Sequence, residues 1–447
     1  MHPYIRRQGR EPVTYLHPLL EPILERTLGV PLFQEQLMQI AVAAGGCTGD
    51  DADLLRRAMG SKRGVEKIER LRAKLYEGMA RNGITGELAD EVYDKIAAFA
   101  NFGFAESHSL SFALLVYASS WLKLHYPAAF LAALLKAQPM GFYSPQSLVA
   151  DAVRHGVEVR HVDVNRSAAD ATLEPLGGAA SAAPELDCLT MWELTDPGEP
   201  WSPNTDGFDH RAHRRDAGFA VRLGLSSVRT IGDDLAERIA AGQPYSDMAD
   251  LVRRCELTTP QVEALATAGA FDGFGRSRRE ALWVAGQVAT ERAGQLPGLY
   301  ADLSPPPLPE MTPYEQTMAD LHAAGVSPDS HPMQHIRATL DERGITPARG
   351  LAAVGNGHRV VVAGVVTHRQ RPATAGGTTF LNLEDETGMI NVICSYPVWI
   401  RHARVARTAA ALMIRGRLET ADGVTNVVAE HIARLPLTIR AMSRDFH

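Results

Sequence analysis

The sequence predicts a multidomain protein that is mostly α-helical over about its first three hundred residues and then forms a small β-barrel. A chain of 447 residues is longer than one ordinary hydrophobic core can organise. Apolar residues recur at helical spacing from residue 18 to about 138, and again from about 219 to 295. Residues 359–435 instead alternate with a period of two in five short segments, which predicts a five-stranded barrel.

Composition narrows the class of protein. A formal net charge of -7 excludes a wholly basic nucleic-acid coat, although local basic patches remain compatible with it. The four cysteines are scattered without a CxxC pair, which argues against a structural zinc site or a disulfide framework. Thiols of this kind are typical of a reducing compartment, so we expect a cytoplasmic protein. The most apolar run is broken by Lys123, His125 and Pro127 and predicts buried helices, so no membrane contact is expected.

The first helical region contains a cluster of cations. The stretch "LFQEQLMQIAVAAGG" predicts a helix that ends at paired glycines. It is followed by "ADLLRRAMGSKR", residues 52–63, which carries Arg56, Arg57 and Lys62. Adjacent arginines on a helix point about 100° apart, so we expect that both cannot face one row of carboxylates. The cluster indicates either a phosphate-binding helix end or an ordinary solvated helix face.

A second cluster opens the next long helix. "SHSLSFALLVYASSWLKLHY" predicts a largely buried helix for which Ser107 is a candidate N-cap. His108 would lie in the first turn, near backbone N–H groups that favour an anionic ligand. A structural cap without any ligand explains the same residues. Pro127 is expected to begin the following helix, "PAAFLAALLKAQ".

Residues 167–217 change in character and predict an irregular linker or an eroded small sheet. Beyond them, "LSSVRTIGDDLAERIAAG" places a short hairpin between apolar helical stretches, and "TAGAF" repeats that pattern in degenerate form. Such a helix-hairpin-helix motif offers backbone N–H groups to a DNA phosphate. An ordinary helical hairpin without DNA contact is the alternative. The candidate DNA-binding residues are Arg229, Thr230, Gly232 and Gly269.

A proline-rich connector and helix, residues 301–358, lead to the barrel at 359–435, and a tail covers residues 436–447. Barrels of the OB type bind single strands through cations and stacking aromatics. The acidic turn "LEDETG" would repel phosphate, and a barrel used for protein contact or packing is the alternative. The residues available for DNA are Phe380, Tyr396 and Trp399, with His368, Arg369, Arg371 and Arg401 nearby.

Several motifs in one order resemble a known family. "GVPLFQEQLMQIA", "ADLLRRAMGSKR", "FGFAESHSLSFALLVYASSWLKLHYPAAF" and "MGFYSPQSLV" look like the fingers region of bacterial C-family DNA polymerases, the DNA polymerase III alpha subunit family. "RLGLSSVRTIGDDLAERI", "SPDSHPM" and "RPATAGGTTFLNLEDETGMINVI" are similar to the error-prone branch of that family. The resemblance covers nearly the whole chain. It implies fingers at 1–166, tandem helix-hairpin-helix motifs at 218–300 and an OB fold at 359–435.

The resemblance also implies roles. In that family the fingers lie over the incoming nucleotide, so Arg56, Arg57 and Lys62 would face its triphosphate, and Ser107 and His108 would lie beside it. The implied activity is DNA-templated nucleotidyl transfer from dNTPs during error-prone, damage-associated synthesis. Mg²⁺ is expected for the full polymerase, and the implied partners are DNA, dNTP and a sliding-clamp-binding accessory protein.

One departure from the family bears on activity. The palm aspartates that hold two magnesium ions, and the PHP domain, precede the "HPYIRR" region in relatives, whereas this sequence starts at that region. We therefore expect no catalytic residue and no bound metal in this chain alone, and a separately encoded PHP–palm half as a partner. Without a palm, apolar faces such as that of "LFQEQLMQIAVA" are expected to lack part of their cover. A non-catalytic DNA-binding or interaction module, or a decayed gene product, remains an alternative.

Overall fold

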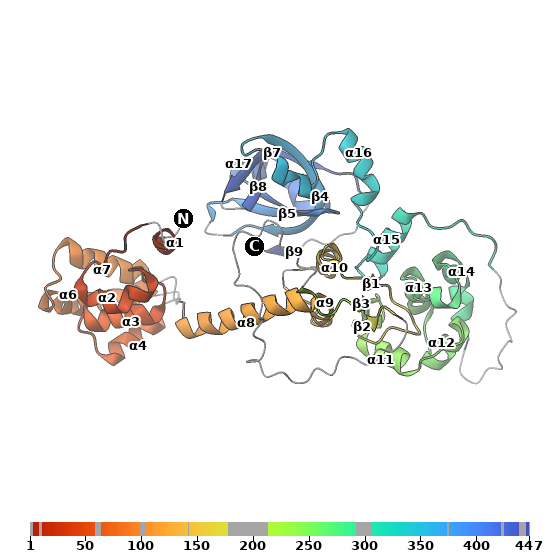
Figure 1. Ribbon diagram of the computed structural model, residues 1–447, viewed down its shortest axis with the longest axis horizontal. Helices are drawn as coiled ribbons and strands as arrows, with labels where there is room; N and C mark the ends of the chain where they lie inside the picture. Colours follow the sequence, from red (N-terminus) through yellow and green to blue (C-terminus); the bar gives the residue numbers. More distant parts are fainter. Residues whose placement is uncertain are drawn as a thin grey trace. The chain divides into compact units, whose positions relative to one another are not determined.

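A computed structural model shows the protein as two compact units, Met1–Trp121 and Leu122–His447. Figure 1 colours the first of these red to orange. The structure describes residues 3–8, 11–58, 64–98, 104–141, 143–177, 213–291, 305–372, 375–421, 424–437 and 444–446. Among these residues, no helix is long and apolar enough to cross a membrane.

The first unit is a bundle of short helices around its own core. Its helices are α1 (Pro3–Arg7), α2 (Glu21–Leu24), α3 (Gln34–Ala43), α4 (Gly49–Ala58), α5 (Gly64–Glu69), α6 (Arg72–Arg81) and α7 (Glu87–Ala98). Leu37, Leu55 and Leu75 from three of these helices are at most 1% exposed and meet in that core. Helix α6 passes so close to the end of α3 that a Cβ at Gly78 would lie 1.8 Å from the carbonyl oxygen of Gly45. A glycine at position 78 is therefore required for this packing.

The structure corrects the prediction about the cover of α3. Leu37, Ile40 and Ala41 of this helix are buried, so its apolar face is packed within the unit, although Val42 is 45% exposed. The loop before α3 is fixed by Gln36, whose Oε1 accepts hydrogen bonds from the backbone N–H groups of Leu32 and Phe33. The first unit therefore supplies most of the cover that we expected this helix to lack, and Val42 remains outside it.

Helix α8 (Glu106–His125) is the element without cover. The prediction of a largely buried helix is wrong for residues 107–120, because all of them except Ser109 and Ala118 are exposed. Leu110, Leu114 and Tyr117 are 73%, 55% and 73% exposed, and only His125 of this helix is buried. A helix with so many apolar side chains is normally enclosed by protein, and the residues that the structure describes leave most of this one exposed.

The second unit begins with two helices and a small sheet. These are α9 (Pro127–Lys136), α10 (Pro145–Arg154), β1 (Val159–Arg160), β2 (Thr172–Pro175) and β3 (Phe219–Arg222). Helix α9 begins at Pro127, as the sequence predicts. The strand order is β1-β3-β2, in which β1 runs parallel and β2 antiparallel to β3. The segment predicted as a linker or eroded sheet thus contributes one strand, β2, and residues 178–212 lie outside the described residues.

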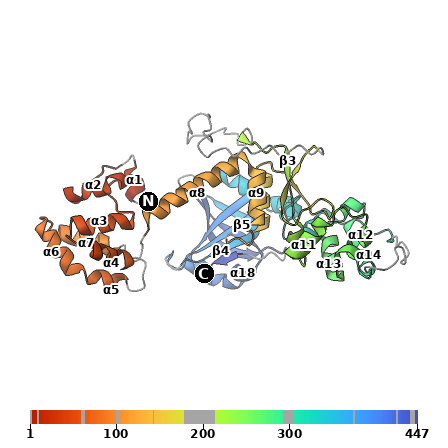
Figure 2. The same cartoon turned by 90° about the horizontal axis from the view of Figure 1, so that it is seen from below.

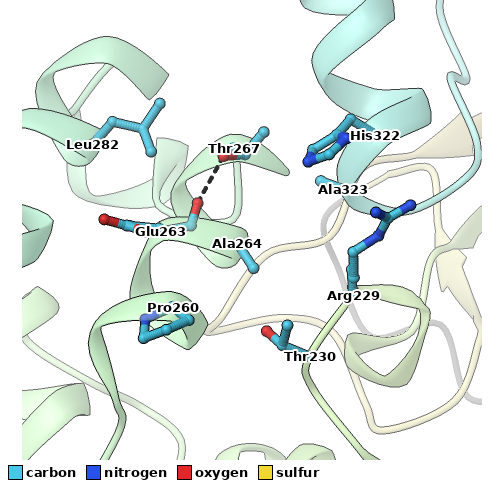
Figure 3. A pocket seen from close by; sticks show the side chains of 9 residues that line it. All are labelled: Arg229, Thr230, Pro260, Glu263, Ala264, Thr267, Leu282, His322 and Ala323. Atoms are coloured by element: carbon cyan, nitrogen blue, oxygen red, sulfur yellow. Dashed lines mark hydrogen bonds between the residues drawn. The ribbon is translucent and has the colours of Figure 1, made fainter. Parts of the chain in front are cut away.

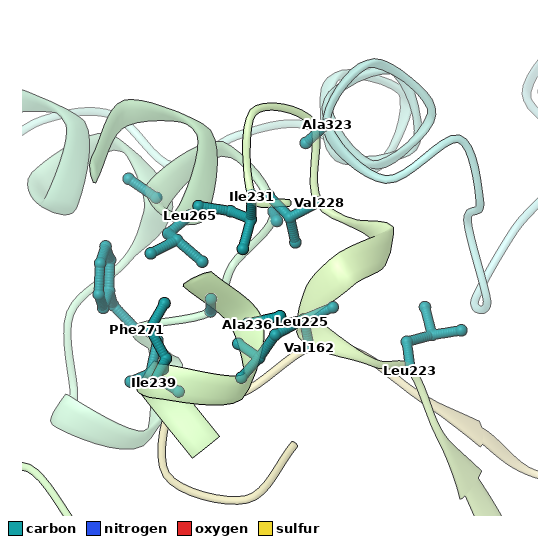
Figure 4. Close-up of a cluster of buried hydrophobic side chains, with 14 of the residues drawn as sticks. Val162, Leu223, Leu225, Val228, Ile231, Ala236, Ile239, Leu265, Phe271 and Ala323 are labelled. Carbon is teal, nitrogen blue, oxygen red and sulfur yellow. The ribbon is translucent and has the colours of Figure 1, made fainter. Parts of the chain in front are cut away.

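A helical region with one continuous core follows. Its elements are the 3₁₀ turn η5 (Leu225–Ser227), α11 (Asp233–Ala241), α12 (Met248–Cys255), α13 (Thr259–Thr267), the 3₁₀ turn η6 (Asp272–Phe274) and α14 (Arg278–Val288). Figure 4 shows the centre of this core, where Val228 and Ile231 of the first hairpin lie among Leu225, Leu265 and neighbouring side chains. The buried side chains of Val228 and Ile231 thereby fix the hairpin backbone to this core.

The connector is packed rather than extended. It contains α15 (Pro313–Ala323), η7 (Gln334–Ile336), α16 (Arg337–Glu342) and η8 (Ala348–Ala353). Met333 and Leu340 pack with Ala363 and Ala411 of the barrel in a separate apolar cluster. Arg337 donates from Nε to Glu386 at 2.5 Å, so the predicted acidic turn is partly neutralised by α16.

The barrel is closed and five-stranded, which confirms the predicted fold class (Figure 2). Its elements are β4 (Arg359–Gln370), β5 (Thr379–Asp385), β6 (Gly388–Cys394), α17 (Tyr396–Arg401), α18 (Ala403–Thr408), β7 (Ala411–Ala421) and β8 (Val424–Arg434). The order β5-β6-β8-β7-β4 closes through β4–β5 pairing. A short strand, β9 (Arg444–Phe446), pairs in parallel with the end of β4.

Helix α10 connects the helical region to the barrel. Ser147 on α10 donates a hydrogen bond of 2.9 Å to Glu384 on β5, and Arg154 lies 3.5 Å from the same carboxylate. Burial raises the pKa of Glu384. The first acidic residue of "LEDETG" is therefore a packing residue between two elements, not a surface charge.

Candidate nucleic-acid interface

The first hairpin presents Arg229 and Thr230 to solvent. The N–H of Ile231 donates to the carbonyl of Val228 at 3.0 Å and closes the turn, and both of these apolar residues are buried. Arg229 and Thr230, between them, are exposed. Thr230 has a φ of 72°, which a β-branched residue rarely adopts. The hairpin therefore holds two polar residues outward in a fixed and strained conformation.

The charge around this hairpin is mixed. Gly232 is the exposed N-cap of α11 with a φ of -76°, so the left-handed turn position is Thr230 and not this glycine, and Asp233 and Asp234 form the first turn of the helix. Carboxylates at this position already interact favourably with the helix N-terminus and repel a phosphate. Arg229 forms no ion pair with any described residue. The positive charge available to an anion at this hairpin thus comes from the Arg229 side chain and not from the helix end.

The second hairpin does not offer Gly269 to a ligand. Gly269 has a φ of +76°, and its N–H donates to the carbonyl of Ala266 at 3.1 Å, as at an ordinary helix end. A Cβ at this position would lie 2.8 Å from Nε of Arg278. The Gly269 backbone is therefore enclosed and its donor is used, so the structure does not place it at a DNA-facing surface.

Arg278 belongs to a buried network instead. It pairs with Asp320 of α15 at 2.7 Å, and Asp320 also accepts from the Ser327 hydroxyl at 3.1 Å. Burial raises the pKa of Asp320 even though this arginine opposes the shift. The network joins α14 to α15 and explains why the second hairpin is turned inward. Trp283 on α14, which is 59% exposed, is a surface aromatic that the sequence analysis did not single out.

The outer face of β5 and β6 is almost free of charge. Phe380 lies opposite Ile393, and Asn382 lies opposite Asn391, with a side-chain hydrogen bond of 3.1 Å between the two asparagines. Phe380 is half-buried on this face. An uncharged strip of this kind can pack against a base but cannot hold a backbone phosphate by itself.

A cation and an aromatic ring stand at the end of β4. The guanidinium carbon of Arg371 lies 5.4 Å from the centre of the Tyr396 ring, and Tyr396 is 48% exposed. Gly377 packs against the same ring, so a Cβ there would approach it to about 3.0 Å. Arg371 forms no ion pair with any described residue. Arginine over an exposed ring is an arrangement suited to a stacked base and its phosphate.

Arg369 does not belong to this surface. It is 8% exposed and donates from Nε to the carbonyl of Ala406 at 2.7 Å and from Nη2 to that of Ala409 at 2.6 Å. A β-bulge between Val366 and His368 shifts the register and turns Arg369 inward, opposite Leu381. Its predicted place among the DNA-facing residues is therefore not supported by its position. Trp399, at 5% exposed, is likewise a core residue.

Arg56 and Arg57 share a single carboxylate, contrary to our expectation. Arg56 donates to Asp53 at 2.8 and 3.0 Å, and Arg57 pairs with the other oxygen of Asp53. Asp53 precedes them by three and four residues, so it lies between them on the helix surface. Hydrogen bonds from Arg56 and then Arg57 lower the pKa of Asp53. Both arginines remain exposed, and Lys62 lies outside the described residues.

The start of α8 is arranged differently from the prediction. The helix begins at Glu106, so Ser107 is its second residue and is not the N-cap. The N–H of Glu106 donates to the Glu35 carboxylate at 3.0 Å, and Arg26 pairs with the Glu106 carboxylate. His108 is in the first turn as predicted, with its ring 4.4 Å from that of Phe112. A carboxylate of the chain itself thus occupies part of the expected anion site.

The described residues contain no group of three or more His, Cys, Asp or Glu side chains that could hold a metal ion. In the second unit, the candidate interface consists of the exposed hairpin residues Arg229 and Thr230 and the barrel residues Arg371, Tyr396 and Phe380. In the first unit, the paired arginines of α4 are a separate candidate site.

Comparison with known families supports the three regions. Residues 1–83 match the bacterial DNA polymerase III alpha subunit finger domain, residues 156–281 match a helix-hairpin-helix motif, and residues 360–435 match an OB-fold nucleic-acid-binding domain. Among solved structures, a replication protein A heterotrimer bound to ssDNA covers 21% of this chain at 16% identity, with a TM-score of 0.17.

Curated relatives match the whole chain. The error-prone DNA polymerases of Mycolicibacterium paratuberculosis, Nocardia farcinica and Cutibacterium acnes are 53%, 54% and 54% identical to it over 100% of its length. The matched region is 38%, 37% and 40% of those proteins. The chain thus spans less than half the length of the relatives it resembles.

Proposed function

Because the chain corresponds over its whole length to the C-terminal portion of error-prone DNA polymerases, with fingers, helix-hairpin-helix and OB-fold regions, we propose that it supplies their nucleotide and DNA contacts. The reaction is DNA-templated nucleotidyl transfer from dNTPs during synthesis across damaged DNA. The chain binds and positions substrates, and it does not extend a primer by itself.

The exposed apolar surface of α8 is the main observation that supports this proposal. A continuous apolar surface of this size on one helix is unfavourable in water and marks a contact with further protein. The relatives contain more than half of their length outside the matched region, which is a sufficient source of that contact. We therefore assign the catalytic carboxylates and the PHP domain to protein that packs on α8.

Arg56 and Arg57 are the proposed triphosphate contacts. Two guanidinium groups on one carboxylate leave a net positive charge at the end of α4, and both side chains have solvent-exposed donors. A triphosphate offers more acceptor oxygens than Asp53 and can take over one or both arginines. Ser107 and His108 are proposed to lie near the same nucleotide.

Magnesium is proposed for the assembled polymerase only. When bound, two magnesium ions would neutralise the charge that develops on the transferring phosphoryl group. The described residues contain no group of three or more His, Cys, Asp or Glu side chains that could hold such an ion. The residues of this chain act by binding phosphate groups and bases, and these contacts position the substrate.

The barrel and the first hairpin are proposed to hold the DNA. Arg371 and Tyr396 form a platform for a base and its phosphate, Phe380 extends it across the uncharged strip, and Arg229 adds a cation at the hairpin. Binding of this kind is weak in sequence preference and weakens steeply as salt rises.

The test is fluorescence anisotropy with a labelled single-stranded oligonucleotide at several salt concentrations. Tyr396→Ala is expected to weaken binding about tenfold, as for loss of one stacking ring. Arg371→Gln is expected to weaken it and to reduce the salt slope by about one. Arg343→Gln removes an exposed arginine elsewhere and serves as the control. Equal binding by all three variants and the unmodified chain would refute the barrel platform.

A non-catalytic DNA-binding or interaction module is the second candidate. It is favoured by the separate cores of the helical region and the barrel, which do not depend on the first unit. The two proposals differ in whether α8 associates with the remaining polymerase portion. DNA binding without that association favours the module.

A further inference from the structure

A pocket of about 260 Å³ opens between the first hairpin, α13, α14 and α15 (Figure 3). Its polar rim is formed by Arg229, Thr230 and His322, and its apolar floor by Pro260, Ala264 and Leu282. The combination differs from a simple phosphate-binding hairpin, because a concave apolar surface lies directly beside the Arg229 guanidinium. A ligand with both an anionic and an apolar part fits such a site better than a phosphate alone.

The rim is fixed by the backbone. The N–H of Arg229 donates to the carbonyl of Ala323, at the end of α15, over 2.7 Å. This bond ties the hairpin to α15 and brings Arg229 next to His322, which is exposed on that helix. The left-handed conformation of Thr230 follows immediately in the chain. Strain of this kind persists where the surroundings impose it and is common at ligand-binding positions.

The charges favour an anion on one side of the pocket only. Arg229 forms no ion pair with any described residue, so its guanidinium is available. The Glu263 carboxylate lies on the side of the pocket away from Arg229 and His322 (Figure 3). The Thr267 hydroxyl is already used, since it donates to the carbonyl of Glu263 at 2.7 Å. An anionic group would therefore be held by Arg229 and His322.

We propose that this pocket binds one unstacked nucleotide of a single DNA strand. Its phosphate contacts Arg229 and His322, and its base lies on the floor of Pro260, Ala264 and Leu282. A base in a duplex cannot enter, because it is stacked and paired, so the site selects single-stranded DNA. The inference rests on the proposed function, since it takes DNA as the ligand. It makes α15 part of the DNA interface and adds His322 to the binding residues.

The experiment compares two labelled single-stranded probes of equal length, a deoxyadenosine oligonucleotide and an oligonucleotide of abasic sites, with the full chain. Ala264→Phe fills the floor of the pocket without changing charge. We expect it to weaken binding of the base-containing probe about tenfold and to leave the abasic probe unchanged. Should this variant fail to fold, Leu282→Trp fills the pocket from the opposite side and carries the same expectation.

The phosphate half of the site is tested separately. Arg229→Gln and His322→Asn should each weaken both probes several-fold, and Arg229→Gln should reduce the salt slope by about one. Arg343→Gln makes the same charge change at a distant exposed position and should leave the difference between the two probes unchanged.

The possible outcomes distinguish a failure of the nucleotide pocket from a failure of the proposed DNA binding as a whole. If the chain binds both probes and none of the pocket variants changes binding, the nucleotide pocket is wrong while the barrel platform stands. If Ala264→Phe weakens both probes equally, the pocket does not hold a base. If the unmodified chain binds neither probe at low salt, the pocket and the proposed DNA binding both fail.

Discussion

Substitutions in the apolar surface of α8 should have a small effect on the stability of the isolated chain and a large effect on its association with further protein. Leu110, Leu114 and Tyr117 are spaced by four and three residues, so they form one stripe along the helix. All three are more than half exposed in this chain. Replacing them with serine should therefore cost the isolated chain little, within about 0.5 kcal/mol of its free energy of unfolding for each change.

The same changes should be costly once α8 is covered. Fully burying such a side chain contributes about 1.5–3 kcal/mol, and most of that is still to be gained at positions exposed by 55–73%. Three substitutions should thus remove about 3–5 kcal/mol from the free energy of association, which is a factor of about 10²–10⁴ in Kd.

The assay measures binding of the chain to the portion of the Nocardia farcinica relative that lies outside the matched region, by calorimetry. The triple variant should unfold as the unmodified chain does and bind far more weakly. Val424→Ser, at an apolar residue that is 50% exposed on the barrel, is the matched control and should leave association unchanged. A triple variant with an unfolding free energy several kcal/mol lower would show that α8 is covered within this chain, and the reasoning would fail.

Three further predictions concern single residues. Arg56→Ala and Arg57→Ala should each lower the efficiency of nucleotide incorporation by an assembled polymerase by about ten- to a hundredfold, because each loses a charge-assisted phosphate contact. Unchanged steady-state kinetics would show that both arginines are surface charges without a phosphate contact. Gly78→Ala should unfold the first unit, because its Cβ would lie 1.8 Å from a backbone oxygen. Gly286→Ala is the control: it has open space around it and should be neutral or slightly stabilising. Equal melting curves for the two variants would contradict the packing of α6. Burial lowers the pKa of His331 to about 4, so the folded state resists its protonation. Stability should therefore be lost as pH falls from about 6.5 to 4, by about 3 kcal/mol in excess of a His331→Asn variant; parallel pH profiles of the two proteins would contradict it.

The sequence was sufficient for the elements whose pattern is local. Five segments of period two gave the barrel strands, and Pro127 marked the start of α9. The bulge between Val366 and His368 could not be seen in that pattern, because one extra residue reverses the faces of everything beyond it. Strict alternation along β4 would turn Arg369 outward, whereas it is inward in the fold.

Other differences arise from contacts that spacing alone does not specify. Asp53 lies between Arg56 and Arg57, although the two arginines point in different directions, because long side chains can converge on one carboxylate. The prediction that α8 is buried assumed that the side chains packing on an apolar helix come from the same chain. His322 and Trp283 carry no local motif, and only the arrangement of α14 and α15 shows where they lie.

Primer extension with reconstitution tests the central claim most directly. The chain is mixed with the unmatched portion of a curated relative, a primed template, dNTPs and Mg²⁺, and each component is also assayed alone. We predict no extension by this chain alone and extension by the mixture, which the α8 triple variant should abolish. Extension by this chain alone, lost on changing an acidic residue within it, would contradict the account, and so would a mixture that binds through α8 but never extends a primer.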